Sequence, residues 1–162
     1  MNRRRLEVEA WRDAMLQVSG ELERPMGGTP TDLSDTNRRR TIYATVARRD
    51  IDALLRLHDF PEPTSHSANR DLTTTPLQQL FVLNSSFMRQ RASALAKHLG
   101  DAAETDSLVK RAHEMLYARL PTPEEMRLAT DYLASDASST RDELLTQYLQ
   151  VILGNNAFFF ID

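Results

Sequence analysis

Residues 73–87 read TTTPLQQLFVLNSSF, and the first half of this stretch has the residues expected at a helix start. Thr75 suits the N-cap because its hydroxyl can accept a hydrogen bond from a free backbone N–H. Pro76 suits the first helical position because it has no N–H to leave unpaired, and Gln78 completes a Thr-x-x-Gln capping box. The threonines and the proline therefore mark the beginning of a helix and are not by themselves an active-site signature.

The residues after Pro76 keep the spacing of one helical face. Ser85 or Ser86 can divide this run into two helices, and Gly100 provides a C-terminal stop. The spacing predicts ten inward-facing residues: Leu77, Leu80, Phe81, Asn84, Phe87, Met88, Arg91, Ala92, Leu95 and Leu99.

Helical spacing also recurs on the N-terminal side of this stretch. A first helix is expected from about Arg4 to Ser19, with Trp11 on its apolar stripe. A short helix capped by Asp50 is expected to end before Pro61. An exposed aromatic platform for sugar binding is not indicated by the placement of Trp11 on an apolar stripe.

The C-terminal half repeats the pattern. Residues 107–120 predict a helix whose last inward residue is Leu120. Thr122 and Glu125 form a second capping box at the start of the next helix. One more helix follows, and the aromatic residues 158–160 are expected to dock on the core.

Residues 39–49, RRTIYATVARR, are the one stretch with strand-like alternation, which includes the β-branched Ile42 and Val46. A lone strand lacks a partner. Either this stretch pairs with a short segment that the sequence does not reveal, or tertiary packing makes it helical. We therefore expect a mostly α-helical, single-domain bundle over residues 1–162, with residues 41–47 as the one candidate for a short β element.

Composition limits the possible partners and chemistry. Lys and Arg number 20 and Asp and Glu number 23, which gives a net charge of -3 and disfavours nucleic acid as a partner. No apolar run approaches the roughly 18 residues that span a bilayer, so no membrane insertion is expected. The chain has no cysteine, its four histidines lack metal-ligand spacing, and no nucleotide or hydrolase motif is present. We expect no catalytic residues, no cofactor and no metal.

The most chemically mixed segment is the loop from His58 to Thr75, because long ordered loops often carry binding function. Arg70 is its best polar anchor, since a guanidinium is a permanently charged fork suited to a carboxylate. The candidate binding residues in this loop are Asp59, His66, Arg70, Asp71 and Thr73.

Three interpretations of this loop stay open. In the first, Arg70 pairs with Asp59 and the other polar residues cap a helix, so the segment is only structural. In the second, the loop binds a protein or glycan partner. In the third, Asp59 and His66 act as acid and base in a hydrolase-like site on an extracellular polymer.

Five stretches, spread over nearly the whole chain, carry a resemblance to a known family. They are NRRRLEVEAWRDAMLQVSGELERPMGG, RRTIYATVARR, TTTPLQQLFVLNSSFM, ARLPTPEEM and LGNNAFFFID. In this order they resemble the C-terminal domain of unknown function found in many large planctomycete proteins.

The resemblance implies that this chain is the C-terminal fragment of a multidomain protein. Such proteins often combine this domain with an exported N-terminal region, another uncharacterised domain and a cytochrome c-like domain. The resemblance therefore implies an exported or cell-envelope location, with upstream domains of the same protein as partners. It implies no heme here, because a chain without cysteine cannot supply the C-x-x-C-H attachment motif.

From these observations we expect a noncatalytic structural or interaction module. The alternative is a contribution to a hydrolase-like or carbohydrate-binding site that acts on extracellular polymer.

Overall fold

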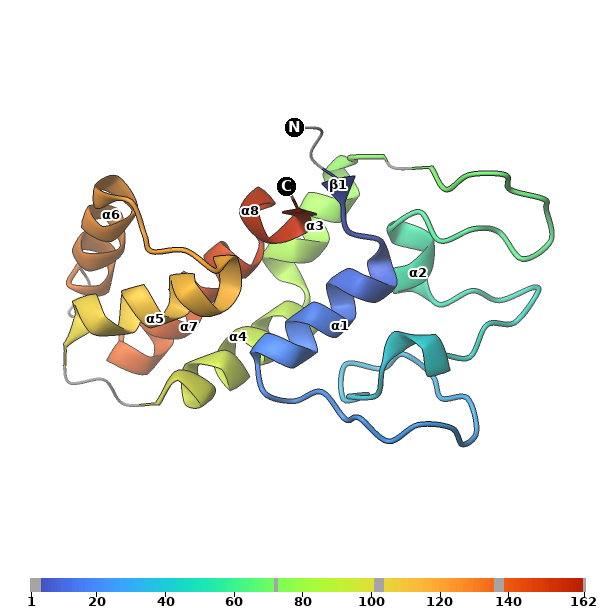
Figure 1. Ribbon diagram of the computed structural model, residues 1–162, viewed down its shortest axis with the longest axis horizontal. Helices are drawn as coiled ribbons and strands as arrows, with labels where there is room; N and C mark the ends of the chain where they lie inside the picture. The colour runs from blue at the N-terminus through green and yellow to red at the C-terminus, as the bar shows by residue number, and fades with distance from the viewer. Residues whose placement is uncertain (1–3, 72, 101–103, 136–138, 162) are drawn as a thin grey trace.

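The computed structural model of this chain describes residues 4–71, 73–100, 104–135 and 139–161, and most of these residues are helical (Figure 1). This confirms the predicted fold class. Leu72, inside the predicted binding loop, lies outside the described residues. In chain order the elements are β1 (Arg4–Arg5), α1 (Val8–Val18), the 3-10 helix η1 (Thr41–Tyr43), α2 (Ala53–Leu57), α3 (Pro76–Asn84), α4 (Ser86–Leu99), α5 (Thr105–Tyr117), α6 (Pro123–Leu133), α7 (Arg141–Leu153), α8 (Asn156–Phe159) and β2 (Phe160–Ile161).

The helix start at Thr75 is confirmed. The Thr75 hydroxyl accepts from the backbone N–H of Gln78, and the Gln78 side chain accepts from the backbone N–H of Thr75. Ser85 then ends α3 and caps α4 by accepting from the backbone N–H of Met88, so the run is divided where the serines predicted. Gly100, with φ of 70°, ends α4. These signals are local, and the structure keeps them.

Two predicted helix starts are wrong. The first helix begins at Val8 rather than Arg4, because Arg4 and Arg5 pair in antiparallel fashion with the last strand, β2. The second is capped by Asp52 rather than Asp50, since the Asp52 carboxylate accepts from the backbone N–H of Leu54 at 2.8 Å. In both cases the chain next to the helix is held by other contacts.

Of the two interpretations left open for residues 41–47, the structure supports the helical one at the start of the stretch, which begins with η1 and makes only isolated bridges afterwards. The cause is a polar contact with α1. The backbone N–H and the hydroxyl of Thr41 both donate to Asp13, at 2.7 and 2.6 Å. That contact turns the chain at Thr41 into a tight helical turn.

Arg12 fastens the long segment that joins α1 to α2. Its guanidinium donates to the carbonyl of Arg39 at 3.0 Å, to the hydroxyl of Thr41 at 3.1 Å and to the carbonyl of Asn37 at 2.5 Å. The side chain is buried beneath these residues. A segment with little regular structure is thus held by one side chain of α1.

The core is built around α4, which packs against α7 and also contacts α1, α3 and α5. Figure 1 shows α5, α6 and α7 gathered at one end of the molecule and the long segments around α2 at the other. Trp11 is buried, with its ring stacked on His58 at 4.7 Å and on Phe159 at 5.0 Å between centroids. Phe158 is buried as well, which confirms that the C-terminal aromatic residues dock on the core.

Some of the predicted inward residues face out. Leu77, Leu80 and Asn84 are exposed, and α3 instead turns Gln78 and Val82 inward. The spacing predicted the wrong buried face because α3 is apolar around most of its circumference, so spacing alone does not select the face that packs on the core.

Leu120 is exposed for a different reason. Ala118 adopts a left-handed conformation, with φ of 53°, and ends α5 before Leu120 is reached. The predicted inward position of Leu120 was therefore wrong because the helix is shorter than its apolar spacing.

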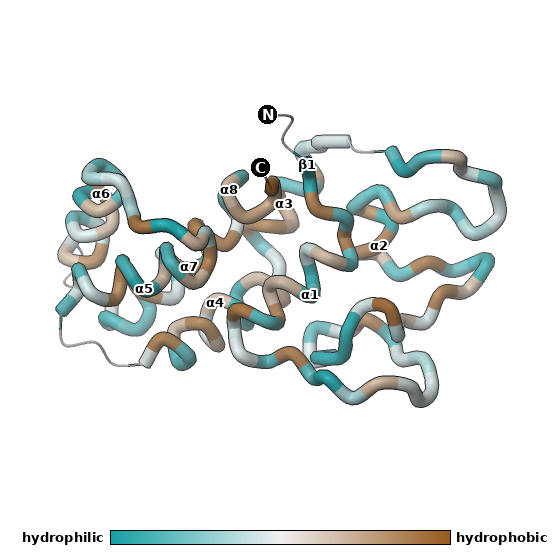
Figure 2. Tube along the Cα trace, in the orientation of Figure 1, coloured by the Kyte–Doolittle hydropathy of each residue, from teal (hydrophilic) through white to brown (hydrophobic). Residues whose placement is uncertain are grey.

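Apolar and polar residues are interspersed along the helices, as the hydropathy colouring in Figure 2 shows. Within the described residues, no helix combines the length and the apolar character needed to span a bilayer.

Candidate functional site

The structure brings two of the predicted binding residues, Asp59 and Thr73, together at the base of the loop. The carboxylate of Asp59 accepts from the backbone N–H of Thr73 at 2.9 Å and from its hydroxyl at 2.7 Å. Asp59 itself has a left-handed backbone, with φ of 64°. The two ends of the loop are therefore tied to each other, and Figure 1 shows the rest of it projecting from the body between α2 and α3.

The structural interpretation of the loop predicted an ion pair between Arg70 and Asp59, but the structure gives Arg70 a different partner. Its two terminal nitrogens donate to the two carboxylate oxygens of Glu9 on α1, each at 2.7 Å, and Glu7 lies 3.3 Å away. Asp59 is occupied by Thr73, which leaves Arg70 to this other partner. Burial acts to raise the pKa of Glu9, but the hydrogen bonds from Arg70 and the backbone outweigh it and lower that pKa. Arg70 thus fastens the loop to α1.

The remaining two predicted residues, His66 and Asp71, are exposed. No hydrogen bond or ion pair among the described residues joins His66 to Asp59. The acid and base of the hydrolase-like interpretation are therefore not assembled in this structure.

The sequence predicted Gln78 only as a capping residue and placed Arg5 in the first helix, without a contact to the loop. Arg5 reaches from β1 to the loop base, where it lies 3.6 Å from Asp59, donates to the carbonyl of Thr73 and donates to Gln78 at 3.3 Å. Gln78, which is buried, also donates to the carbonyl of Leu57 at 2.9 Å. The polar side chains of β1 and α3 therefore close the base of the loop and set the rotation of α3.

The fixed rotation of α3 leaves Leu77, Leu80 and Leu83 on its outer side, where they are 65%, 52% and 61% exposed. The three leucines are spaced three residues apart and therefore share one helix face. We call this surface the leucine face. The spacing of leucines in the sequence is visible, but their exposure depends on the contacts of Gln78.

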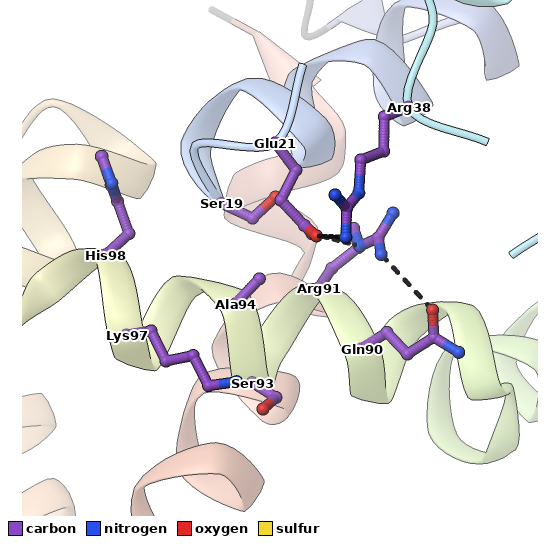
Figure 3. Close-up of a pocket in the computed structure, with 9 residues that line it drawn as sticks. All are labelled: Ser19, Glu21, Arg38, Gln90, Arg91, Ser93, Ala94, Lys97 and His98. Carbon is purple, nitrogen blue, oxygen red and sulfur yellow. Dashed lines mark hydrogen bonds and ion pairs between the residues drawn. The ribbon is translucent and has the colours of Figure 1, made fainter. Parts of the chain in front are cut away.

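A polar groove of about 570 Å³ lies between the C-terminal end of α1 and the outer side of α4 (Figure 3). Glu21, Arg38 and Arg91 converge at one end of it. The sequence predicted Arg91 only as an inward position and placed Arg38 in the basic stretch NRRR of residues 37–40, but it did not predict that these residues meet. Their separation along the chain conceals the cluster.

A smaller, mostly apolar pocket of about 260 Å³ lies among α5, α6 and α7. At its edge, His113 Nε2 lies 3.1 Å from the hydroxyl of Tyr148, and His113 Nδ1 lies 3.9 Å from Glu125. Burial lowers the pKa of His113 and raises the pKa of Tyr148 to about 12, whereas hydrogen bonds from Arg119 lower the pKa of Glu125 to about 2. Tyr148 is therefore protonated at neutral pH and is not an activated nucleophile.

The fold and these sites define a mostly α-helical domain with a fixed polar loop and an exposed leucine face. The family model described as PSD1, protein of unknown function (DUF1553), matches residues 1–133, so the chain belongs to this family. This match confirms the family resemblance of the sequence. The matched segment ends with Leu133, the last residue of α6, although α7 beyond it packs against α4. Comparisons with curated proteins and with solved structures gave no match.

Proposed function

We propose that this domain is a noncatalytic interaction module of an exported or cell-envelope multidomain protein, and that α3 is its docking helix. The exported location rests on the family resemblance. The observation that supports docking is the leucine face, three exposed leucines on one side of a short helix. Contiguous apolar surface of this kind marks interaction sites in soluble proteins.

The leucine face cannot be buried by a simple rotation of α3. Gln78 on the opposite side is 3% exposed and is bonded to Arg5 and to the carbonyl of Leu57. Rotation would break these bonds and leave buried polar groups unpaired, at a cost of about 1–3 kcal/mol for each group. Full burial of one leucine against a partner contributes about 1.5–3 kcal/mol. Docking therefore offers stabilisation that the isolated domain lacks.

The partner we propose is another domain of the same parent protein. Arg5 of β1 is bonded to Gln78 of α3, so a domain joined ahead of β1 would emerge beside the helix that carries the leucine face. A short covalent connection gives an effective concentration on the order of millimolar, at which even a small apolar contact is occupied.

The test is hydrogen exchange of α3 in the parent protein. A variant with Leu77→Gln, Leu80→Gln and Leu83→Gln should exchange its α3 amides faster than wild type, while unfolding of the core remains unchanged. Leu120→Gln is the matched control, because Leu120 is 57% exposed and lies outside α3. Equal exchange in wild type and the triple variant would reject α3 as the docking helix.

A further inference from the structure

The groove of Figure 3 contains a buried arginine whose hydrogen bonds are incomplete. Arg91 is 1% exposed, and its Nη1 has no hydrogen-bond partner among the described residues. Its Nε lies 2.9 Å from Glu21, yet this N–H is not directed at the carboxylate, so the contact is an ion pair without a hydrogen bond. Only Nη2 donates, to Gln90 at a long 3.4 Å. A buried guanidinium normally has its donors satisfied, so this site requires an explanation.

The charge at the groove is also unbalanced. Glu21 places one carboxylate oxygen 2.9 Å from Arg91 and the other 2.9 Å from Arg38. A single carboxylate thus serves two guanidinium groups, and Lys97 adds a third cation to the lining. Asp35 is the next carboxylate whose charge acts on Arg91. Even when Asp35 is included, the two carboxylates do not balance the three cations.

Other features of the groove leave room for a ligand. Part of the groove is lined by the small side chains of Ser93 and Ala94 from α4, which Figure 3 labels. The side chain of Arg38 is 51% exposed, and Lys97 is exposed, so both cations are accessible. Arg91 beneath them is screened from water, where its charge acts more strongly on nearby ions.

We propose that this groove binds a small oxyanion of the phosphate or sulfate type. The oxyanion accepts hydrogen bonds from Arg38 and Lys97 at the surface and compensates the charge that Glu21 leaves unmatched on Arg91. Guanidinium groups suit this role because their fork of donors matches the oxygens of tetrahedral anions. The site is independent of the leucine face and of the proposed docking function.

The competing explanation is an ordered water that satisfies Arg91, since buried waters commonly pair with such groups. Water requires no anion and predicts no specific response to one. The two explanations differ most in the role of Glu21, which competes with a bound oxyanion but supports a bound water.

The experiment is an amide NMR titration of the full chain with sodium phosphate, against sodium chloride at matched ionic strength to account for screening. Saturable shifts are expected near Glu21 and along α4 around Ala94. Arg38→Gln combined with Lys97→Gln should weaken the phosphate Kd by about tenfold or more, since hydrogen bonds to charged groups are lost. Lys110→Gln, an exposed residue of α5 outside the groove, is the matched control and should leave Kd unchanged.

A second variant tests the sign of the Glu21 contribution. Glu21→Gln keeps the shape of the side chain and removes the competing charge, so phosphate should bind several-fold more tightly. Sulfate should compete with phosphate for the same resonances. Shifts that do not saturate, that persist in the double variant or that weaken in Glu21→Gln would overturn the proposal and leave water as the partner of Arg91.

Discussion

Two buried arginines, Arg12 of α1 and Arg91 of α4, lie over the same phenyl ring but differ in how completely their guanidinium groups are hydrogen-bonded. Their guanidinium carbons are 5.8 and 5.1 Å from the centroid of Phe87. Arg12 donates to two carbonyls and a hydroxyl of the segment that joins α1 to α2, and within the described residues none of its nitrogens is buried without a partner. Arg91 has two buried nitrogens without hydrogen bonds.

The difference shows how burial of a charge is to be interpreted. At Arg12 neutral acceptors satisfy the guanidinium, so the buried charge stabilises the fold by holding the segment between α1 and α2 in place. Where one carboxylate is shared with a second arginine, as at Arg91, the region keeps excess positive charge and unpaired donors. The first region needs no ligand, and the second is stabilised by one.

The largest expected effect compares these two arginines directly. Arg12→Met should lower the free energy of unfolding by about 3 kcal/mol, because it leaves the carbonyls of Asn37 and Arg39 without their donor. Arg91→Met should cost about 1 kcal/mol or less, because it also removes a poorly satisfied buried charge. Urea unfolding of both variants measures the difference. Equal costs would show that Arg91 is as much a fastener as Arg12.

Local features of both regions could be predicted from the sequence. The capping boxes at Thr75 and Thr122 were predicted correctly because both partners lie within one helical turn. The docking of the C-terminal aromatics followed from their hydrophobicity, which Phe158 and Phe159 satisfy in the core. Fold class is the sum of such local signals, so it too was predictable.

What the sequence could not predict depends on contacts between distant residues. Thr41 turns into η1 because it bonds to Asp13, and Arg70 bonds to Glu9 of α1. The outward face of α3 is selected by Gln78, whose partner is the carbonyl of Leu57. The groove likewise joins residues of α4 to others well outside it. Spacing along one helix contains none of this information.

The second prediction disturbs the turn that joins the end of α1 to Glu21. Gly20 has φ of 74°, and an added Cβ would lie 2.7 Å from Nδ1 of His98. Gly20→Ala should cost about 1–2 kcal/mol, from the left-handed backbone and from displacement of the exposed His98 ring.

Gly27→Ala is the matched control for Gly20→Ala. Gly27 has φ of 78°, and nothing lies within 4 Å of an added Cβ, so it reports the backbone cost alone, about 1 kcal/mol. Thermal melts measure both variants. A Gly20→Ala protein as stable as Gly27→Ala, with an unmoved His98 resonance, would show that this contact does not hold the end of α1.

The third prediction assigns the pH dependence of stability to the core rather than to the groove. Burial lowers the pKa of His58 and of His113. The unfolded chain therefore binds more protons below its histidine pKa of about 6.5, and stability is lost as pH falls below that value. Unfolding measured between about pH 7.5 and pH 5 checks this, since most carboxylates titrate lower.

Two histidine variants separate the contributions to that pH dependence. His58→Phe keeps an aromatic ring against Trp11 and should flatten the loss of stability, because one group no longer resists protonation. His113→Phe removes the other buried imidazole and should flatten the loss of stability as well. A slope that persists unchanged in both variants would contradict the assignment.

The smallest expected effect concerns Arg70, a cation of the loop that already has its partner. Its side chain is 30% exposed and that of Glu9 is 26% exposed, so solvent screens the pair. Arg70→Ala should therefore cost at most about 1 kcal/mol, and Glu9→Ala should cost about the same. The double variant should cost less than the sum of the two, since each single change removes the same interaction.

The same variant also tests binding, because Arg70 already has its partner whereas Arg38 is a cation of the proposed anion site. Because both terminal nitrogens of Arg70 are directed at Glu9, Arg70→Ala should change neither the phosphate response of the groove nor the exchange of α3 in the parent protein. Arg38→Gln, which alters a cation of the groove, should weaken the phosphate response. If Arg70→Ala instead releases the proposed interdomain contact while its unfolding curve stays unchanged, then Arg70 is a binding anchor and the loop, rather than α3, carries the interaction.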